Sequence, residues 1–267
     1  MSVAAGLLGS LLGLGGGIIV VPALTLWFHI DIRYAIGASI VSVIATSCGA
    51  AVSYVRERLA NIRVAMVLEL ATTAGALTGA FLAGRLGVRW LFLIFGVVMA
   101  YSAILMFRRR DQDVTRAPRR APWADRLRLH SSYIDQESGE EILYRVSRTR
   151  VGLVLMYVAG VVSGLLGIGS GALKVPAMDI AMGLPMKVSS ATSNFMIGVT
   201  AAASAGVYFA RGDIDPFVAG PVAVGVLFGA VLGSRLLHRL SNSAVRLMFV
   251  LVLLWVSGQM LLRGIRG

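Results

Sequence analysis

Two stretches of the chain decide its fold: residues 13–22 read GLGGGIIVVP, and residues 167–176 read GIGSGALKVP. They lie 154 positions apart. Pairs matched at the same offset are Arg33 with Lys187, Ser39 with Ser193, Thr46 with Thr200, and Tyr54 with Tyr208. Farther on, GALTGAFLAGRL (75–86) matches GVLFGAVLGSRL (225–236) at an offset of 150. Unrelated apolar helices do not share Gly, Pro and basic positions in register, so the sequence predicts a two-fold internal repeat.

The composition indicates a membrane protein. Hydrophobic residues make up 57% of the chain and charged residues 14%, whereas soluble domains carry about 25% charged residues. Long stretches without any charge are 1–28, 34–54, 90–107, 151–173, 188–210, 216–234 and 247–262. A bilayer core needs roughly 20 apolar residues per helix, and most of these stretches suffice. The predicted fold class is therefore an all-α polytopic membrane protein.

Each copy of the repeat reads as a broken segment followed by three transmembrane helices. Residues 151–186 form an apolar stretch too long for one span, and Gly167, Gly169, Gly171 and Pro176 interrupt it. Irregular backbone at membrane depth is tolerated only inside protein or beside a water-filled cavity. Paired interruptions in corresponding positions point to a transporter's binding site. If each broken segment is re-entrant, the halves are inverted; if each crosses once, they are parallel. We favour inversion, which ion-coupled transporters with midplane sites often use.

The predicted organisation is a first transmembrane repeat (1–107), a cytoplasmic basic linker (108–149) and a second transmembrane repeat (150–267). Residues 108–150 contain eleven Arg and seven acidic residues. The linker opens with a basic run, and SYIDQESGEEILYRV (132–146) alternates around a turn, which suggests a small β-hairpin. The net charge of +12 sits in this linker and at the ends of apolar runs, as lipid headgroups require, so we expect no nucleic-acid partner. We also expect no cleavable signal, because no basic region precedes the first apolar stretch.

The glycine clusters of the two broken segments are the first candidate site. A half-helix N-terminus exposes unpaired N–H groups and about half a positive charge, and glycine lets an oxyanion approach the backbone. The candidate substrate-binding residues there are Gly15, Gly16, Gly17, Gly169, Ser170 and Gly171. The alternative is that glycine only permits close helix packing, and we prefer that interpretation for Gly9, Gly13, Gly75, Gly79, Gly225, Gly229 and Gly233.

Polar residues near the breaks extend the candidate site. The hydroxyl and amide groups of Ser39, Thr192, Ser193 and Asn194 could donate to a bound oxyanion, or could instead bond their own helix or link helices. Lys174 is a cation inside an apolar run, so it marks a function or a cavity; it could pair with Asp179, sit beside the anion, or reach the interface. Glu69 is an isolated acid in an apolar run, and it is either a proton carrier or a side chain that snorkels to the interface.

Other functional classes find no support. The three histidines, His29, His130 and His238, are scattered, and no metal spacing, nucleophile elbow or acid pair is present. We therefore expect no enzyme activity, no cofactor and no metal site. Residues 167–172 fit a loose dinucleotide pattern, but no strand precedes it and no acidic residue follows at the required spacing.

The two broken motifs resemble those of the TauE/SafE family of sulfite exporters. GLGGGIIVVPAL (13–24) and SGLLGIGSGALKVPAM (163–178) carry the resemblance, together with AIGAS (35–39) and SSATSNF (189–195). Ser170 departs from it, since the family usually has a third glycine there. The resemblance implies a secondary transporter of sulfite or small sulfur-containing organic anions such as sulfonates, in the cytoplasmic (inner) membrane of a prokaryote.

The function expected from the sequence is thus a secondary anion transporter that exports its substrate, with a midplane site between the broken segments. An anion channel on the same scaffold is the first alternative, and a membrane anion sensor or scaffold is the second. The expected partners are a small sulfur-containing anion and membrane lipid, with a homodimer left open.

Overall fold

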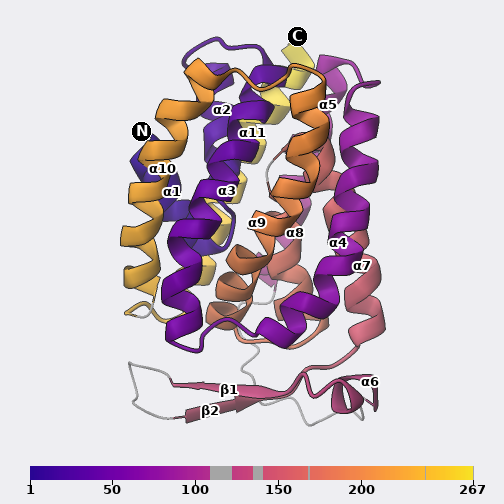
Figure 1. Cartoon of the computed structure of the whole chain (residues 1–267), viewed down its shortest axis with the longest axis vertical. Coiled ribbons are helices and arrows are strands. Elements are labelled where there is room, and N and C mark those ends of the chain that lie inside the picture. The colour runs from indigo at the N-terminus through magenta and orange to yellow at the C-terminus, as the bar shows by residue number, and fades with distance from the viewer. Residues whose placement is uncertain (109–121, 135–140, 168, 238, 267) are drawn as a thin grey trace.

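The computed structural model describes residues 1–108, 122–134, 141–167, 169–237 and 239–266 (Figure 1). The first half contains α1 (Ser2–Leu12), α2 (Gly17–Leu26), α3 (Ile32–Arg56), α4 (Ile62–Ala83) and α5 (Val88–Arg108). Between the halves lie α6 (Pro122–Arg126), β1 (Ser131–Ile134) and β2 (Glu141–Tyr144). The second half contains α7 (Thr149–Leu166), α8 (Gly171–Pro176), the π-helical turn η1 (Ala177–Ala181), α9 (Met186–Ala210), α10 (Pro216–Leu237) and α11 (Asn242–Arg266).

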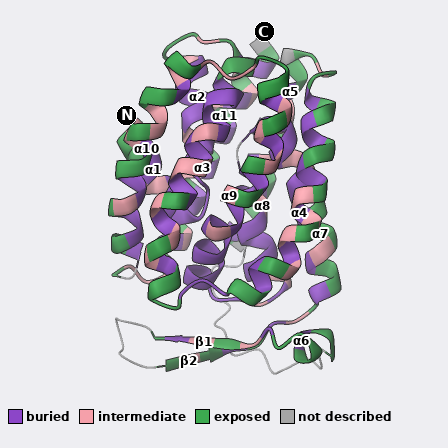
Figure 2. Cartoon of the chain, viewed as in Figure 1, coloured by how far each residue is buried: buried purple, intermediate pink, exposed green. Residues whose placement is uncertain are grey.

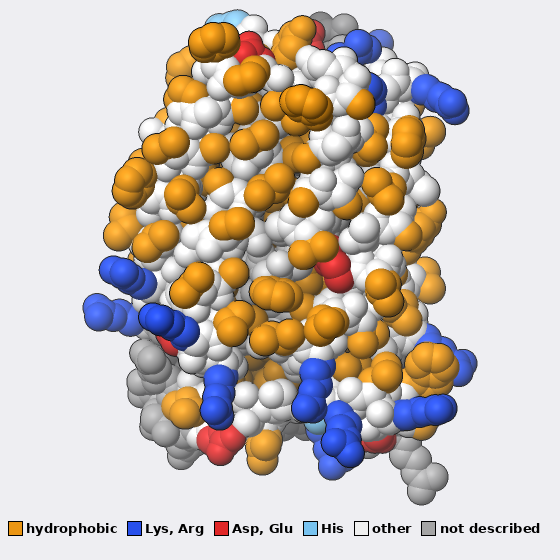
Figure 3. All heavy atoms as spheres, viewed as in Figure 1, with side chains coloured by type: hydrophobic (Ala, Val, Ile, Leu, Met, Phe, Trp, Pro, Cys, Tyr) orange, Lys and Arg blue, Asp and Glu red, His pale blue; other side chains and the backbone are white. Residues whose placement is uncertain are grey.

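The outer surface of the helical body is apolar. Among the described residues, six helices are long and apolar enough to cross a membrane, namely α3, α4, α5, α7, α10 and α11. Large side chains such as Leu70 (78% exposed) and Phe217 (91% exposed) point outward, and Figure 3 shows hydrophobic side chains over most of the visible face. Figure 2 shows the buried residues on the inward sides of the helices. An apolar surface this extensive needs lipid around it, so the chain is a multi-pass membrane protein.

Local sequence sets where the helices begin and bend. Asp31 caps α3 by accepting from the Arg33 N–H (2.8 Å), and Asn61 caps α4 by accepting from the Val64 N–H (3.1 Å). Pro176 ends α8 and cannot donate a backbone hydrogen bond, and the widened turn η1 follows it directly. The polar run SSATSN (189–194) lies in the first half of α9, where the helix is buried among its neighbours.

The connections between helices show the chain direction in each half. Asn61, in the α3–α4 connection, donates from Nδ2 to the carbonyl of Leu129 (2.9 Å), so this connection lies at the linker end. The start of α3 lies at the opposite end, beside the α9–α10 connection, since a Cβ on Gly37 would come 2.1 Å from the Asp213 carbonyl oxygen. Helices α3 and α9 pack side by side and run in opposite directions (Figure 1).

The broken segments pack on the opposite halves. Helix α1 lies along α10, and α7 lies along α4, while α5 pairs with α11. Ser147 precedes α7 and donates its N–H to the carbonyl of Met182, which follows η1, at 2.9 Å. The second broken segment therefore begins and ends at the linker end, and Figure 1 shows α2 leading instead toward the opposite end.

Glycines bring these helices into backbone contact, as the packing interpretation predicts. A Cβ on Gly79 of α4 would lie 2.0 Å from the Val161 carbonyl oxygen of α7. A Cβ on Gly229 of α10 would lie 1.9 Å from the Val3 carbonyl oxygen of α1. Neither position has room for a larger residue, so glycine sets the separation of the two helix pairs.

The linker forms a small layer at one end of the bundle (Figure 1). Strand β1 pairs antiparallel with β2, with Ser131 opposite Tyr144. The Tyr144 hydroxyl accepts from Asn61 Nδ2 (3.0 Å), and burial raises the pKa of this phenol above its ordinary value, so the hydroxyl stays neutral. Most of the basic run (109–121) and the expected hairpin turn (135–140) lie outside the described residues.

Candidate functional site

The helix breaks of the two broken segments, at residues 13–16 and at residues 167 and 169–170, lie against each other. In the first break, Gly13, Gly15 and Gly16 have left-handed φ angles of 70°, 75° and 71°. A Cβ on Gly171, just after the second break, would lie 2.1 Å from the Gly13 carbonyl oxygen and 2.6 Å from Leu14 Cα. The broken segments thus meet through their backbones, and only glycine permits that approach.

The second break follows the same backbone path with one substitution. Gly167 and Gly169 have φ angles of 63° and 78°, and Ser170 follows with a φ of 56°. A serine in this conformation is strained relative to glycine. Its hydroxyl is buried and, within the described part of the chain, has no hydrogen-bond partner. This is the residue that departs from the family pattern.

Two serines each donate a hydrogen bond to the helix break of the opposite half. Ser39 of α3 donates its hydroxyl to the Gly167 carbonyl (2.7 Å), and Ser193 of α9 donates to the Gly13 carbonyl (2.8 Å). Each break is therefore held by a helix of the other half. Both hydroxyls link helices in this conformation, which is the alternative that the sequence left open; their binding of substrate stays a prediction.

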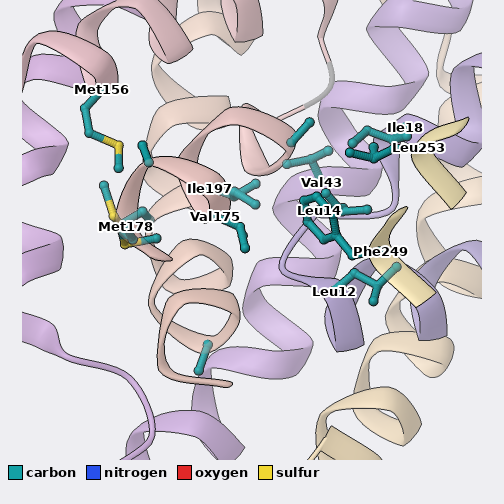
Figure 4. Packing of buried hydrophobic residues seen from close by; sticks show 14 of the residues in the cluster. Leu12, Leu14, Ile18, Val43, Met156, Val175, Met178, Ile197, Phe249 and Leu253 are labelled. Carbon is teal, nitrogen blue, oxygen red and sulfur yellow. The ribbon is translucent and has the colours of Figure 1, made fainter. Parts of the chain in front are cut away.

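Val43 of α3 and Ile197 of α9 lie between the breaks. A Cβ on Gly15 would come 3.0 Å from Ile197 Cγ2 and 3.2 Å from Val43 Cγ1. A Cβ on Gly169 would come 2.7 Å and 2.8 Å from the same two atoms. Figure 4 shows both side chains within the apolar core beside Leu14. Gly15 and Gly169 thus face the same two branched apolar side chains.

The remaining polar candidates on α9 are only partly satisfied. Thr192 Oγ1 accepts from the Asn61 N–H (3.0 Å). Asn194 Nδ2 donates to the Ser10 carbonyl (2.5 Å), which binds α9 to the end of α1. Its Oδ1 is buried and has no partner among the described residues. The amide therefore has hydrogen-bonding capacity to spare beside the first break.

Lys174 pairs across the bundle with Glu69. Its ammonium is fully buried and donates to Thr200 Oγ1 (2.6 Å), and it lies 3.5 Å from Glu69 Oε2. The Thr200 hydroxyl in turn donates to Glu69 Oε1 (2.6 Å). The carboxylate is 13% exposed and also accepts from Thr72 and Thr73 of its own helix. Lys174, Glu69 and Thr200 form a charged triad that joins α8, α4 and α9.

This geometry corrects two expectations for Lys174. Asp179 is not its partner, because Arg246 Nη2 lies 3.3 Å from both carboxylate oxygens of Asp179. Lys174 does not reach the interface either, since its side chain has no exposed surface. Glu69 turns toward the triad rather than toward a headgroup layer. The sequence did not single out Thr200, although its match with Thr46 at the repeat offset was a usable signal.

The groups brought together here can bind a small ligand. No group of three or more His, Cys, Asp or Glu side chains among the described residues could hold a metal ion. What the geometry provides is buried glycine backbone, a free hydroxyl, an amide with one unused N–H, and a charged pair one helical turn beyond the break.

Comparison with known proteins agrees with the motifs. The family model described as "Sulfite exporter TauE/SafE" matches residues 1–260. The probable membrane transporter protein YunE of Bacillus subtilis is 26% identical over 272 residues, covering 98% of this chain and 95% of that protein. A probable membrane transporter protein of Xylella fastidiosa (strain 9a5c) is 30% identical over 243 residues, covering 89% and 84%.

The similarity extends to an archaeon. The probable membrane transporter protein MJ0441 of Methanocaldococcus jannaschii is 23% identical over 267 residues, covering 93% of this chain and 88% of that protein. No solved structure matches the chain with comparable significance. With a family model matched over nearly its whole length, this chain belongs to the TauE/SafE family of sulfite exporters, which are membrane transporters.

Proposed function

We propose that the protein is a secondary transporter of sulfite or small sulfonates, with its substrate site where the two breaks meet. The observation that carries this proposal is the backbone contact between the breaks, with two hydrogen-bond donors buried beside them: the unpartnered Ser170 hydroxyl and the second N–H of Asn194 Nδ2, whose other N–H bonds Ser10. Buried polar atoms normally have partners, so a free hydroxyl donor at a helix break favours a ligand-binding role for this position. A small oxyanion accepts hydrogen bonds from hydroxyl, amide and glycine N–H groups alike.

We also propose that the two halves form an inverted repeat around this location. The opposite directions of α3 and α9, and the entry of the two broken segments from opposite ends, are what inversion requires. The reciprocal bonds of Ser39 and Ser193 are related by the 154-residue offset, as are Val43 and Ile197. Two inverted units around a fixed site allow one unit to rock against the other, which exposes the site alternately to each side.

The triad is the proposed coupling element. Glu69 is an acid inside the bundle whose charge is balanced by Lys174. A proton on Glu69 would leave the Lys174 ammonium without its carboxylate partner. The positive charge on α8, which follows the second break, would then be unbalanced. Coupling of this kind needs an ionisable group inside the membrane, where an unpaired charge is costly.

The proposed location is the cytoplasmic membrane of a prokaryote, with the linker in the cytoplasm. Figure 3 shows basic side chains gathered around the linker end of the bundle. Short loops rich in Lys and Arg stay on the cytoplasmic side.

Flux measurements in proteoliposomes test the function. Sulfite, methanesulfonate, sulfate, phosphate and chloride are offered singly, and we expect sulfite or methanesulfonate to be moved best. If all five anions move equally well, and only down their concentration gradients, the anion-channel alternative is favoured. Binding without any flux would favour the sensor or scaffold.

A further inference from the structure

A pocket opens at the end of the bundle opposite the linker. It has a volume of about 220 Å³ and is lined from α3 by Arg33 and Ile36, and from α9 and the loop after it by Tyr208, Arg211 and Asp213. One water needs only about 15 Å³ of such space, so the pocket has room for a small oxyanion with some of its hydration. It is referred to below as the Arg33 pocket.

The two arginines of the pocket differ in how many of their hydrogen-bond donors are already used. Arg211 donates from Nε (2.8 Å) and Nη2 (2.6 Å) to one oxygen of Asp213, and from Nη1 to the Ala80 carbonyl (2.8 Å). Its guanidinium also lies over the Tyr208 ring, with 4.4 Å between Cζ and the ring centroid. Two of its five N–H groups remain unused. Arg33 is exposed, and its side chain makes no hydrogen bond or ion pair with the described residues.

The second break lies behind two of the side chains that line the pocket, Ile36 and Tyr208. Tyr208 donates its hydroxyl to the Gly164 carbonyl (2.7 Å), in the last turn of α7. Ile36 lies against Gly167, where a Cβ would come 2.5 Å from Ile36 Cγ2. An anion in the pocket is therefore separated from the break by a single layer of side chains, and a path from the pocket to the proposed site would cross only that layer.

The corresponding position at the linker end is closed. The residues 154 positions from Arg33, Ile36 and Tyr208 are Lys187, Ser190 and Tyr54. Ile36, Tyr208 and their counterparts are all buried, so the two ends differ in the cation: Arg33 is exposed, whereas Lys187 is only 2% exposed. In this conformation the equivalent cation cannot receive an anion from solution, so the Arg33 pocket gives access from one side.

We propose that the Arg33 pocket binds the transported anion at the mouth of the path, with Arg33 in direct contact and Arg211 held beside it by Asp213. Two guanidinium groups and one carboxylate leave one net positive charge, which suits a monoanion. The apolar lining from Ile36 and Leu91 suits a small apolar substituent, as in a short alkanesulfonate. This inference rests on the proposed function for the identity of the anion.

The test uses Arg33→Gln in the full chain, with Arg33→Lys as the conservative variant. Arg56→Gln is the matched control, since Arg56 is an exposed arginine at the other end of the same helix. For methanesulfonate flux we expect Arg33→Gln to raise KM about tenfold, the loss of one hydrogen bond to a charged group, with kcat unchanged. Arg33→Lys should recover most of the affinity, and Arg56→Gln should behave as wild type. Asp213→Asn should lower KM, because it keeps an oxygen that accepts from Arg211 but removes the negative charge beside the anion.

Calorimetric titration of methanesulfonate in the Asn194→Ala background separates this site from the central one. In the Asn194→Ala variant, the remaining methanesulfonate binding should depend on Arg33 and weaken with added salt. Equal effects of Arg33→Gln and Arg56→Gln on KM, binding and salt dependence would overturn the pocket while leaving the proposed function in place. Arg33-dependent binding in a protein that moves no sulfur anion would instead overturn the proposed function and leave the pocket standing.

Discussion

The ammonium of Lys174 lies 3.5 Å from a carboxylate oxygen of Glu69, although 105 residues separate them in the chain. One residue belongs to the second broken segment and the other to a long helix of the first half. Thr200 bridges them with bonds of 2.6 Å on each side. The positive charge of Lys174, on the second broken segment, is thus balanced by the carboxylate of Glu69.

Replacing Glu69 by Gln should abolish transport driven by a pH gradient. The amide keeps the shape and the hydrogen bonds to Thr200 but cannot take up and release a proton. Substrate binding to the purified protein should persist. Glu57→Gln, at an exposed carboxylate beside the linker, is the control. Coupled flux in Glu69→Gln at the wild-type rate would remove Glu69 from the coupling mechanism.

Replacing Lys174 by Met should destabilise the protein, because it leaves the Glu69 charge without a cation. Removing one partner of a buried ion pair costs about 3–5 kcal/mol. The double variant Lys174→Met/Glu69→Gln should recover most of this, since it leaves no unpaired charge. Thermal unfolding in detergent measures the cycle. Additive losses in the double variant would show that the pair is not coupled.

Sulfite binding by the Lys174→Met variant tests whether Lys174 also contributes to the anion site. If Lys174 contributes to the anion site, affinity for sulfite should fall and its dependence on salt should flatten, in the double variant as well. Wild-type affinity in the double variant would confine Lys174 to the ion pair.

Ser170→Gly separates binding from stability. Glycine adopts a φ of 56° without strain, so we expect the variant to be at least as stable as the wild type. Loss of the free hydroxyl should nevertheless weaken sulfite binding by roughly 1–3 kcal/mol, the range for hydrogen bonds to charged groups. Calorimetry and thermal unfolding on the same preparation give both values. Unchanged affinity would place the hydroxyl outside the site.

Gly79→Ala should push α4 and α7 apart. The added methyl would meet the Val161 carbonyl oxygen at 2.0 Å, and overpacking of this kind costs about 1–3 kcal/mol. Gly258→Ala is the control, because a Cβ there meets nothing within 4 Å and alanine favours a helix by roughly 0.5–1 kcal/mol. Opposite shifts in unfolding temperature are expected, and equal shifts would contradict the packing described for Gly79.

Much of the architecture could be predicted from the sequence because it depends on local patterns. Apolar stretches locate the helices, and the Gly and Pro residues around Gly15 and Gly169 locate the breaks. Helix packing through Gly79 and Gly229 also follows from small residues at helical spacing. These features need no knowledge of which helices become neighbours.

The contacts across the bundle could not be predicted in the same way. The partner of Lys174 lies on α4, and that of Asp179 lies on α11, because helix neighbours depend on the three-dimensional arrangement of the halves. A pair of Lys174 with Asp179 was one alternative that the sequence left open, although their five-residue spacing places them poorly on one helix face, and the structure does not form it. The Arg33 pocket combines residues from the start of α3 and the end of α9, and no motif connects them.

The central claim is that the contact between the two breaks is the anion site of a coupled transporter. Its most direct test is sulfite accumulation in proteoliposomes under an imposed pH gradient, comparing wild type with Asn194→Ala. We predict uphill accumulation that an uncoupler abolishes, and for Asn194→Ala a loss of affinity by roughly 1–3 kcal/mol, from the hydrogen bond to a charged ligand. Sulfite that only equilibrates, at a rate and affinity that neither the uncoupler nor the substitution changes, would contradict the claim.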